Sequence, residues 1–348
     1  MTSSGSVTFR EADYLRLLAF GTTAFELVHS AIEFGLFDLL EAADGMDVET
    51  VAKSIGVEPQ PARVLLLGLA SLQLLERRDG RYVNSPMTRR RLLSQGERPL
   101  GDFIKVQADI VNEGMTDFTE AIRQNTNVGL RHTAGEGATL YARLAAQPEL
   151  QELFYANMGD VSKTVFAQIF DRFDFSSVHH VIDIGGGDGA GSVELATRFP
   201  HLRVTVFDHE SAAQFFAQRS DGAELADRVR FSPGDMFTDP LPAGGDAIIY
   251  AHIFEIWSLE RNVALLRKCY DALPEGGVCM IYNFVSDDEG TGPLRAGLMS
   301  PYFLTVASGE GMIYSAADIE RALLDAGFSS VDRQEGMAFG HALVVGRK

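Results

Sequence analysis

The first half of the chain carries the hydrophobic periodicity of helices. Apolar side chains recur at three- and four-residue intervals, and they predict helical segments over residues 24–40, 48–55 and 62–75. Asp47 is placed to cap the second of these segments, and Gly56 to end it. Residues 74–83, with Asp79-Gly80 at their centre, then predict a tight β-hairpin. Helices followed by such a hairpin indicate a winged-helix arrangement.

The third helical segment bears on whether this arrangement binds DNA. Its residues 64–70 (VLLLGLA) are apolar on every face, and little beyond Arg63 and Gln73 is polar. Base recognition needs several exposed polar side chains, whereas a helix that is apolar all round is normally buried. The basic residues 89–91 are typical of a solvated helix face. We therefore expect an interface or scaffold role and not DNA binding.

Short β-rich runs alternate with helical stretches from residue 178 onward. Strands are expected over residues 180–184, 203–207, 229–231, 246–250 and 278–284, helices over 191–199, 212–219, 260–273 and 316–326, and two closing strands over 331–334 and 342–345. Such alternation indicates a parallel sheet covered by helices on both faces. We expect an α/β fold, with a mainly helical winged-helix domain over residues 1–165 and a Rossmann-like domain over residues 166–348.

Composition and charge narrow the classes of partner. The chain has 348 residues, enough for about two domains, and its 30 Lys and Arg against 48 Asp and Glu give a net charge of −18, which repels nucleic acid. No apolar run approaches the roughly 20 residues that span a bilayer, and residues 1–10 show no secretory signal. Cys269 and Cys279 are too few for a disulfide framework or a Cys-rich zinc site. We expect a cytoplasmic protein with neither nucleic acid nor membrane as partner.

The strongest local motif is VIDIGGGDGAG, residues 181–191, at an expected strand-to-helix turn. Glycines such as Gly185 and Gly187 let the backbone approach a ligand there and adopt positive φ. Asp208 ends the next strand, where a carboxylate can accept hydrogen bonds from ribose hydroxyls. The motif therefore predicts a nucleotide cofactor, although a purely structural turn is an alternative.

Two cofactors fit this turn. Together with Ala190 the glycines satisfy the GxGxxG/A pattern of NAD enzymes, which by itself is a weak signal. S-adenosylmethionine is favoured, because Asp183 lies two residues before the first glycine, where its carboxylate can face a cationic amino-acid end. Asp235 and Met236 follow the third strand and are placed to meet an adenine ring.

Five motifs in order give the chain a family resemblance from about residue 24 to its end. They are SAIEFGLFDLL…VETVAKSIGV…RVLLLGLASLQLLE, VIDIGGGDG, FDHE, GDMF and IWSLERNVALLRKCYDALPEGG. The chain resembles the small-molecule O-methyltransferases of the plant caffeic-acid and bacterial polyketide type. The resemblance implies S-adenosyl-L-methionine as cofactor, a Rossmann-like methyltransferase sheet, and a homodimer whose winged-helix domains intertwine and help cover the partner's active site.

The resemblance also implies roles for individual residues. Asp208 would hold the ribose, and Asp235 and Met236 would hold the adenine. Gly185 would let the cofactor approach the backbone closely. The methyl acceptor would contact side chains of two helical segments, namely Phe154, Asn157 and Met158, and Met299, Tyr302 and Phe303. A lysine common in the family is replaced here by Ala251.

The family's catalytic base is a histidine in a His-Asp-Trp-Ser segment, and here the pattern breaks. Aligned on Trp257-Ser258, its position holds Glu255. An ordinary glutamate, with a pKa of about 4.3, is a poor base for a phenol of pKa about 10, unless burial raises its pKa. An ionised carboxylate beside the sulfonium would also stabilise the ground state more than the transition state.

His252, three residues before Glu255, is the alternative base. In a helical turn the two side chains would share a face and pair, so that the carboxylate orients the imidazole. Alternatively, His252 is a core histidine and Glu255 begins an exposed helix. No third ligand accompanies them at a convincing spacing, so we expect no metal.

We therefore expect methyl transfer from S-adenosylmethionine to a small aromatic or polyketide-like acceptor in secondary metabolism, such as antibiotic biosynthesis. Oxygen is the default target by resemblance. Three alternatives remain: carbon or nitrogen methylation; a relative that binds the cofactor but hydroxylates, decarboxylates or rearranges its substrate; and a regulatory protein, which the apolar third helical segment disfavours.

Overall fold

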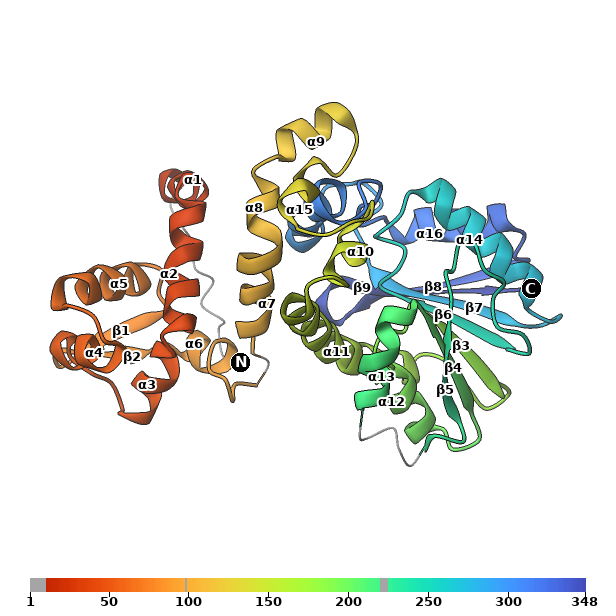
Figure 1. Ribbon diagram of the computed structural model, residues 1–348, viewed down its shortest axis with the longest axis horizontal. Coiled ribbons are helices and arrows are strands. Elements are labelled where there is room, and N and C mark those ends of the chain that lie inside the picture. Colours follow the sequence, from red (N-terminus) through yellow and green to blue (C-terminus); the bar gives the residue numbers. More distant parts are fainter. Residues whose placement is uncertain (1–10, 98, 220–224) are drawn as a thin grey trace. The chain divides into compact units, whose positions relative to one another are not determined.

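The computed structural model describes residues 11–97, 99–219 and 225–348, except for the side chains of residues 159–165. Residues 1–10, in which we see no secretory signal, lie outside the described residues. The chain divides into two compact units, Met1–Ala108 and Asp109–Lys348, called here the helical unit and the sheet unit (Figure 1). Residues 109–165 therefore pack within the second unit. A functional boundary after residue 165 stays a prediction.

The helical unit contains α1 (Glu11–Ala19), α2 (Gly21–Glu33), α3 (Leu36–Ala42), α4 (Val48–Ile55), α5 (Pro59–Ser71), β1 (Leu75–Arg78), β2 (Arg81–Asn84), α6 (Pro86–Arg91) and α7 (Gly101–Val106). The helix expected over residues 24–40 is broken in two, because Gly35 adopts a φ of +60° between α2 and α3. Asp47 caps α4 as predicted, accepting a hydrogen bond from the Thr50 amide at 2.8 Å. Gly56 ends that helix with a φ of +72°.

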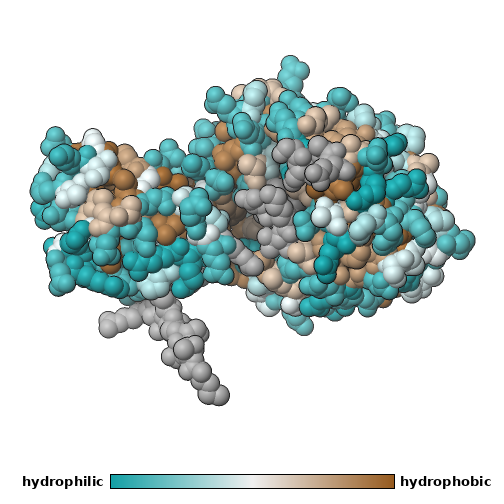
Figure 2. All heavy atoms as spheres, turned by 90° about the horizontal axis from the view of Figure 1, so that it is seen from below, coloured by the Kyte–Doolittle hydropathy of each residue, from teal (hydrophilic) through white to brown (hydrophobic). Residues whose placement is uncertain are grey.

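The helix α5 begins three residues earlier and ends four residues earlier than its expected range of 62–75. Leu65, Leu66 and Leu69 lie in the core of the helical unit. Val64 and Leu67, however, are 59% and 68% exposed. Hydrophobic side chains thus reach the surface of this unit (Figure 2, brown). An apolar helix face left outside the core is typical of an interaction surface.

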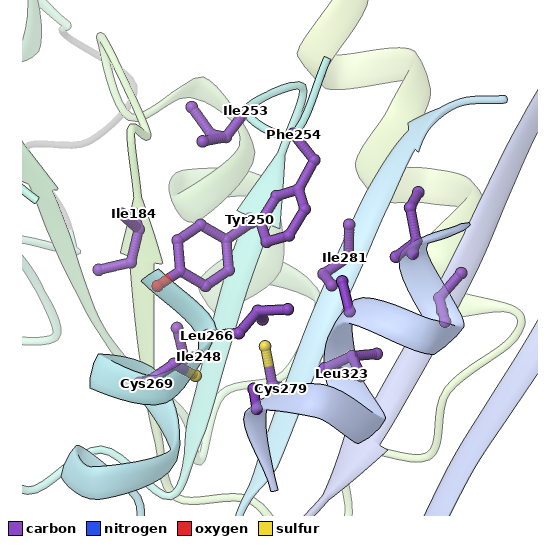
Figure 3. Close-up of a cluster of buried hydrophobic side chains, with 14 of the residues drawn as sticks. Ile184, Ile248, Tyr250, Ile253, Phe254, Leu266, Cys269, Cys279, Ile281 and Leu323 are labelled. Atoms are coloured by element: carbon purple, nitrogen blue, oxygen red, sulfur yellow. The ribbon is translucent and has the colours of Figure 1, made fainter. Parts of the chain in front are cut away.

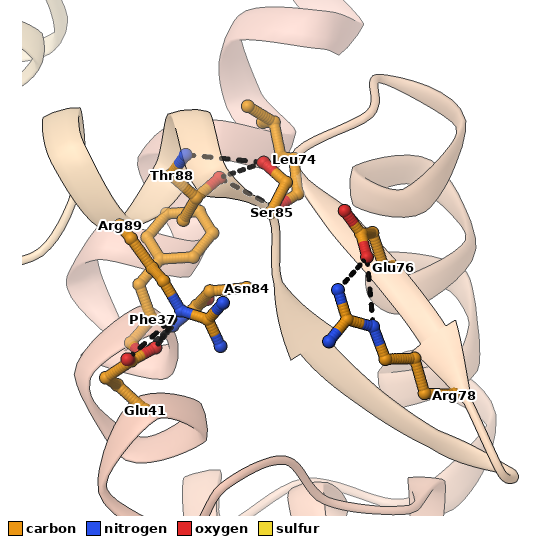
Figure 4. Close-up of polar contacts among 9 residues, drawn as sticks. All are labelled: Phe37, Glu41, Leu74, Glu76, Arg78, Asn84, Ser85, Thr88 and Arg89. Atoms are coloured by element: carbon orange, nitrogen blue, oxygen red, sulfur yellow. Dashed lines mark hydrogen bonds and ion pairs between the residues drawn. The ribbon is translucent and has the colours of Figure 1, made fainter.

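The predicted hairpin is present, and polar contacts attach it to the neighbouring helices. Strands β1 and β2 pair antiparallel. At the end of β2, the Asn84 amide donates to the Phe37 carbonyl at 2.8 Å and to the Glu41 carboxylate at 3.0 Å (Figure 4). Arg89 pairs with the same carboxylate at 3.0 Å. This arginine of the 89–91 cluster therefore serves an internal contact.

The sheet unit holds a seven-stranded sheet in the order β5-β4-β3-β6-β7-β9-β8. Its strands, all expected from the sequence, are β3 (His180–Ile184), β4 (Arg203–Asp208), β5 (Val229–Pro233), β6 (Ala247–Ala251), β7 (Val278–Phe284), β8 (Ser330–Met337) and β9 (His341–Arg347). All run parallel except β9, which is antiparallel to both neighbours. Only Ala338–Gly340 separates β8 from β9, and so short a link permits only an antiparallel pair.

Helices cover both faces of this sheet, as predicted (Figure 1). The α-helices of the sheet unit are α8 (Asn112–Met115), α9 (Phe118–Gln124), α10 (Leu140–Leu144), α11 (Pro148–Phe170), α12 (Ala190–Arg198), α13 (Ala213–Gln218), α14 (Leu259–Ala272), α15 (Leu294–Tyr302) with its continuation η5 (Phe303–Ala307), and α16 (Ala316–Ala326). On one face, Tyr250 and Ile281 of the sheet meet Leu266 of α14 and Leu323 of α16 (Figure 3). On the other, α11 and α12 cover the sheet. No described helix is both long and apolar enough to cross a membrane.

The strand order locates the ligand site. From β3 the chain adds β4 and β5 on one side, and then returns to place β6 and β7 on the other. Such a reversal opens a crevice at the carboxyl ends of the strands, where open α/β sheets bind ligands. The glycine-rich motif follows β3 at this edge.

Candidate functional site

The glycine turn after β3 has a backbone that glycine alone adopts readily. Gly185, Gly187 and Gly189 have φ of +72°, +58° and +76°. A Cβ on Gly185 would also collide with the Ile253 side chain, and one on Gly187 would lie 3.4 Å from the Tyr155 ring. Gly185 therefore needs both small size and positive φ, whereas Gly187 needs glycine for its positive φ, and such a backbone can approach a ligand closely.

Asp208 joins this turn to the end of β4. One carboxylate oxygen accepts a hydrogen bond from the Gly187 amide at 2.8 Å, and the other accepts one from the His209 amide at 2.6 Å. Burial nevertheless raises the pKa of this carboxyl, against the effect of these bonds. The carboxylate expected to meet the ribose is thus held rigidly beside the turn.

Asp183 lies beneath the turn and is almost fully buried. It accepts a hydrogen bond from the Ser192 hydroxyl at 2.7 Å. Burial, with smaller contributions from the nearby Asp208 and Asp188, raises its pKa to about 6, although the hydrogen bond from Ser192 acts in the opposite direction. Asp188 is paired with Arg219 at 2.6 Å. Asp183 and Asp208 still favour a cationic ligand, because a positive charge near them would relieve their repulsion. These carboxylates fit S-adenosylmethionine and would repel a pyrophosphate.

Asp235 and Met236 follow β5 in a turn that the protein fixes internally. Asp235 accepts a hydrogen bond from the Phe237 amide at 2.7 Å. Lys268 donates to the Met236 carbonyl at 2.7 Å. Phe237 packs edge-on against Trp257, with ring centroids 4.8 Å apart. An adenine contact by Asp235 and Met236 stays a prediction.

His252 and Glu255 form a buried pair in the turn after β6. The His252 Nδ1 lies 3.0 Å from the Glu255 carboxylate, and the side chains are only 6% and 3% exposed. The segment is a tight turn and no helix, and His252 adopts a φ of +58°. Glu255 therefore does not begin an exposed helix; α14 begins later, capped by Ser258.

This pair leaves two polar atoms without partners. Among the described residues, neither His252 Nε2 nor the second Glu255 oxygen has a hydrogen-bond partner, although both are buried. A buried polar atom without a partner is costly. The arrangement can supply a hydrogen-bond acceptor to a ligand through the imidazole, which Glu255 orients.

Aromatic side chains surround Glu255. Burial raises the pKa of Tyr302 to about 12 and that of Tyr141 well above its ordinary value, and the Glu255 charge adds to both shifts. Tyr141 meets Phe154 of α11 edge-on at 5.8 Å between ring centroids. Met299 and Tyr302 pack with Phe303 in one cluster that also includes Tyr141.

The structure thus brings Phe154, Met299, Tyr302 and Phe303 into one aromatic region near the His252–Glu255 pair. Asn157 and Met158 lie about one turn after Phe154 on α11, half-buried, and their contact with an acceptor stays a prediction. Sequence reasoning did not select Tyr141 or Tyr155. Tyr155 stacks on Phe215 at 4.5 Å. A signal for it was its position next to Phe154.

Among the residues that the structure describes, no group of three or more His, Cys, Asp or Glu side chains is arranged to hold a metal ion. Cys269 and Cys279 are unbridged and buried in the core. A sheet with this strand order, a glycine turn after its first strand and an acidic residue ending the second defines an α/β enzyme of the nucleotide-cofactor class.

Comparisons with known proteins narrow this class. A family model of the O-methyltransferase domain matches residues 115–329, and a model of the O-methyltransferase dimerisation domain matches residues 17–94. The chain belongs to the O-methyltransferase family. It is accordingly a methyltransferase that depends on S-adenosylmethionine, as the resemblance predicted, and the rival NAD interpretation is wrong.

Three relatives span almost the whole chain. It is 37% identical to L-tyrosine C(3)-methyltransferase of Streptomyces lavendulae, over 90% of this chain and 86% of that protein. It is 32% identical to 3-hydroxy-5-methyl-1-naphthoate 3-O-methyltransferase of Streptomyces sahachiroi, over 90% and 88%. The apo crystal structure of the S-adenosylmethionine-dependent methyltransferase SibL has 36% identity and a TM-score of 0.78, covering 97% of this chain and 99% of that one.

Proposed function

We propose that this methyltransferase acts on a small phenolic acceptor of secondary metabolism, and that His252 removes the acceptor's proton. The observation that carries the proposal is the buried pair of His252 and Glu255, 3.0 Å apart, beside an aromatic region. The ionised Glu255 would accept the Nδ1 proton of His252, leaving the Nε2 lone pair for the phenol. Glu255 would also stabilise the imidazolium that then forms.

S-adenosylmethionine, when bound, supplies an electrophilic methyl group together with its leaving group. We assign Asp208 to its ribose hydroxyls, Asp235 and Met236 to its adenine, and Asp183 to the charge of its amino-acid end. Gly185 and Gly187 allow the close approach. The aromatic region then orients the acceptor, and proximity provides most of the acceleration.

Oxygen and ring carbon are both possible methyl acceptors in this proposal. Removing the phenol proton makes the oxygen nucleophilic, and the negative charge is shared with the ring carbons next to it. The same base therefore serves either product. The two relatives named above illustrate this, since one is a C-methyltransferase and the other an O-methyltransferase. We take oxygen as the default target and ring carbon as the second candidate.

Two measurements test this function. S-adenosylmethionine and S-adenosylhomocysteine should raise the melting temperature, and NAD should leave it unchanged. Incubation with S-adenosylmethionine labelled on the methyl group and a panel of phenols should then transfer the label, and NMR of the product assigns it to oxygen or carbon. A phenol consumed without gain of label would refute methyl transfer and support a non-methylating reaction.

The dimerisation-domain match supports a homodimer, and the methyltransferase family supports a small-molecule acceptor. We further propose that α1 and α5 form the dimer contact. No residue of α1 is buried, and its Leu15 and Leu18 are each 59% exposed. A helix of nine residues is marginal in water without packing. We propose that neither nucleic acid nor a membrane is a partner of this protein. A cytoplasmic location stays a prediction.

Leu67→Asp should shift the protein from dimer to monomer in light scattering, because it places a charge on the exposed apolar face of α5. Leu324→Asp is the matched control, since Leu324 is 50% exposed on α16 of the sheet unit. A dimer that persists in Leu67→Asp at micromolar concentration would place the contact elsewhere.

A further inference from the structure

His341 is a buried histidine at the ligand edge of the sheet. It is the first residue of β9 and pairs with Phe284, the last residue of β7. Because β9 runs antiparallel, its first residue lies at the carboxyl ends of the parallel strands, where the glycine turn and His252 also lie. Its side chain is 2% exposed. Sequence reasoning gave it no role.

Neighbouring groups fix the ring of His341. Its Nδ1 lies 2.8 Å from the Ala338 carbonyl, which can only accept, so this nitrogen carries the proton and Nε2 presents a lone pair. The ring stacks on Tyr282, with centroids 4.7 Å apart, and lies tilted by 32° against the Phe284 ring, with centroids 4.0 Å apart. Burial is the largest cause that lowers the pKa of His341 to about 3, against the effect of the hydrogen bond with the Ala338 carbonyl. The imidazole is therefore neutral.

His341 and His252 are direct neighbours. Their ring centroids are 5.1 Å apart, and the rings are nearly perpendicular. Within the described part of the chain, neither Nε2 atom has a hydrogen-bond partner, and the Tyr282 hydroxyl beside them has none either. In the proposed function the Nδ1 of His252 donates its proton to Glu255, 3.0 Å away, and both imidazoles would then offer an Nε2 lone pair. Two unpartnered acceptors, contributed by residues 89 positions apart, call for a ligand that brings more than one donor.

We propose that His341 is a recognition residue for the methyl acceptor. Its Nε2 accepts a hydrogen bond from a second donor group of the acceptor, on the position next to the hydroxyl whose proton goes to His252. The inference rests on the proposed function, because it places the acceptor beside His252. It adds a requirement of its own: an aromatic ring with two neighbouring donors binds better than one with a single donor.

The test is a binding measurement, so it does not depend on turnover. Calorimetry of the full-length protein, loaded with S-adenosylhomocysteine, compares catechol with 2-methoxyphenol, in which the second donor is replaced by an ether. One additional hydrogen bond to a buried acceptor should favour catechol by about tenfold. In His341→Phe, which retains the aromatic packing, the two affinities should become equal. In His341→Gln, which keeps an acceptor near the Nε2 position, part of the preference should return.

Two results would overturn the proposal. One is equal binding of the two phenols by the wild-type protein, which would mean that a water molecule satisfies both imidazoles. The other is a tenfold preference that persists in His341→Phe. Methyl transfer to a phenol with a single hydroxyl, measured separately, reports on His252 alone. If the wild-type protein does not methylate such a phenol, the proposed function is contradicted, and the comparison of catechol with 2-methoxyphenol is unaffected.

Discussion

The proposed cofactor side and the proposed acceptor side of the sheet unit satisfy their polar groups in opposite ways. Around the glycine turn, Asp183 and Asp208 already hold hydrogen bonds from Ser192, Gly187 and His209. On the acceptor side, His252 and His341 each leave a buried nitrogen without a partner among the described residues. The first region is complete before a ligand arrives and suits one constant cofactor. In our proposal the acceptor completes the second region, and specificity would therefore reside there.

The largest expected effect is that of replacing His252, which should change turnover but not the affinity for the cofactor. His252→Ala should lower kcat by about 10²- to 10⁴-fold, the usual contribution of a general base, because the phenol keeps its proton. Affinity for S-adenosylhomocysteine, measured by calorimetry, should stay within about twofold of wild type. His179→Ala is the control, since His179 is 75% exposed. Full turnover in His252→Ala would mean that the displacement needs no base.

A smaller expected effect is a pH dependence of the fold's stability, which Asp183 causes. Its pKa is about 6 in the folded chain against 3.8 ordinarily, so the stabilising protonated form is fully present below pH 3.8. That stabilisation is lost as the pH rises through about 6. Asp183→Asn should therefore gain stability relative to wild type between pH 4 and pH 7, by up to about 3 kcal/mol.

Urea unfolding at pH 4, 5, 6 and 7 measures the effect of Asp183→Asn. Asp271→Asn serves as the control, because Asp271 is exposed. A stability difference that does not change with pH would show that Asp183 is not held in its protonated form.

A substitution of Asp208 tests cofactor binding, and we expect it to change the affinity by one to two orders of magnitude. Asp208→Ala should weaken S-adenosylhomocysteine binding by about 10- to 100-fold, the contribution of a charged hydrogen bond, and leave the acceptor side intact. Asp288→Ala is the control, because Asp288 is an exposed carboxylate that pairs with Arg333. If catechol binding to the cofactor-free protein fell as steeply as cofactor binding, the two sides would not be separable.

The smallest expected effect concerns the backbone of the turn. Gly185→Ala should destabilise the fold by about 1–2 kcal/mol, because alanine is strained at a φ of +72°. Gly297→Ala, in α15 with no atom near its Cβ position, should instead stabilise by up to about 1 kcal/mol. Thermal unfolding compares the two. Equal melting temperatures would mean that the turn adapts freely.

The sequence predicts features that depend on neighbouring residues better than contacts between distant parts of the chain. The strands, the glycine turn and the hairpin follow from local periodicity and turn chemistry, and so does the capping of α4. The pairing of His252 with Glu255 was foreseeable because the two residues lie three positions apart. One local detail was missed: the expected long helix breaks at Gly35, where a favourable apolar pattern concealed a left-handed residue.

The rest depends on contacts between distant parts of the chain. Tyr141, Glu255 and Tyr302 come from three segments more than 40 residues apart, and no local pattern connects them. His341 reaches His252 only because β9 runs antiparallel beside β7. Periodicity describes one element at a time, so it identifies elements and turns and leaves such clusters undetected.

Two consecutive residues of α11 have a consequence for how acceptor range can change. Phe154 contacts Tyr141 on the acceptor side, while Tyr155 lies against the glycine turn on the cofactor side. A substitution that shifts this helix therefore disturbs both sides at once, so new acceptors gained through α11 would come with altered cofactor affinity. Helix α15, which bears Met299 and Tyr302, has no described contact with the glycine turn. Libraries that diversify α15 and leave α11 unchanged should yield new acceptor ranges at constant cofactor affinity.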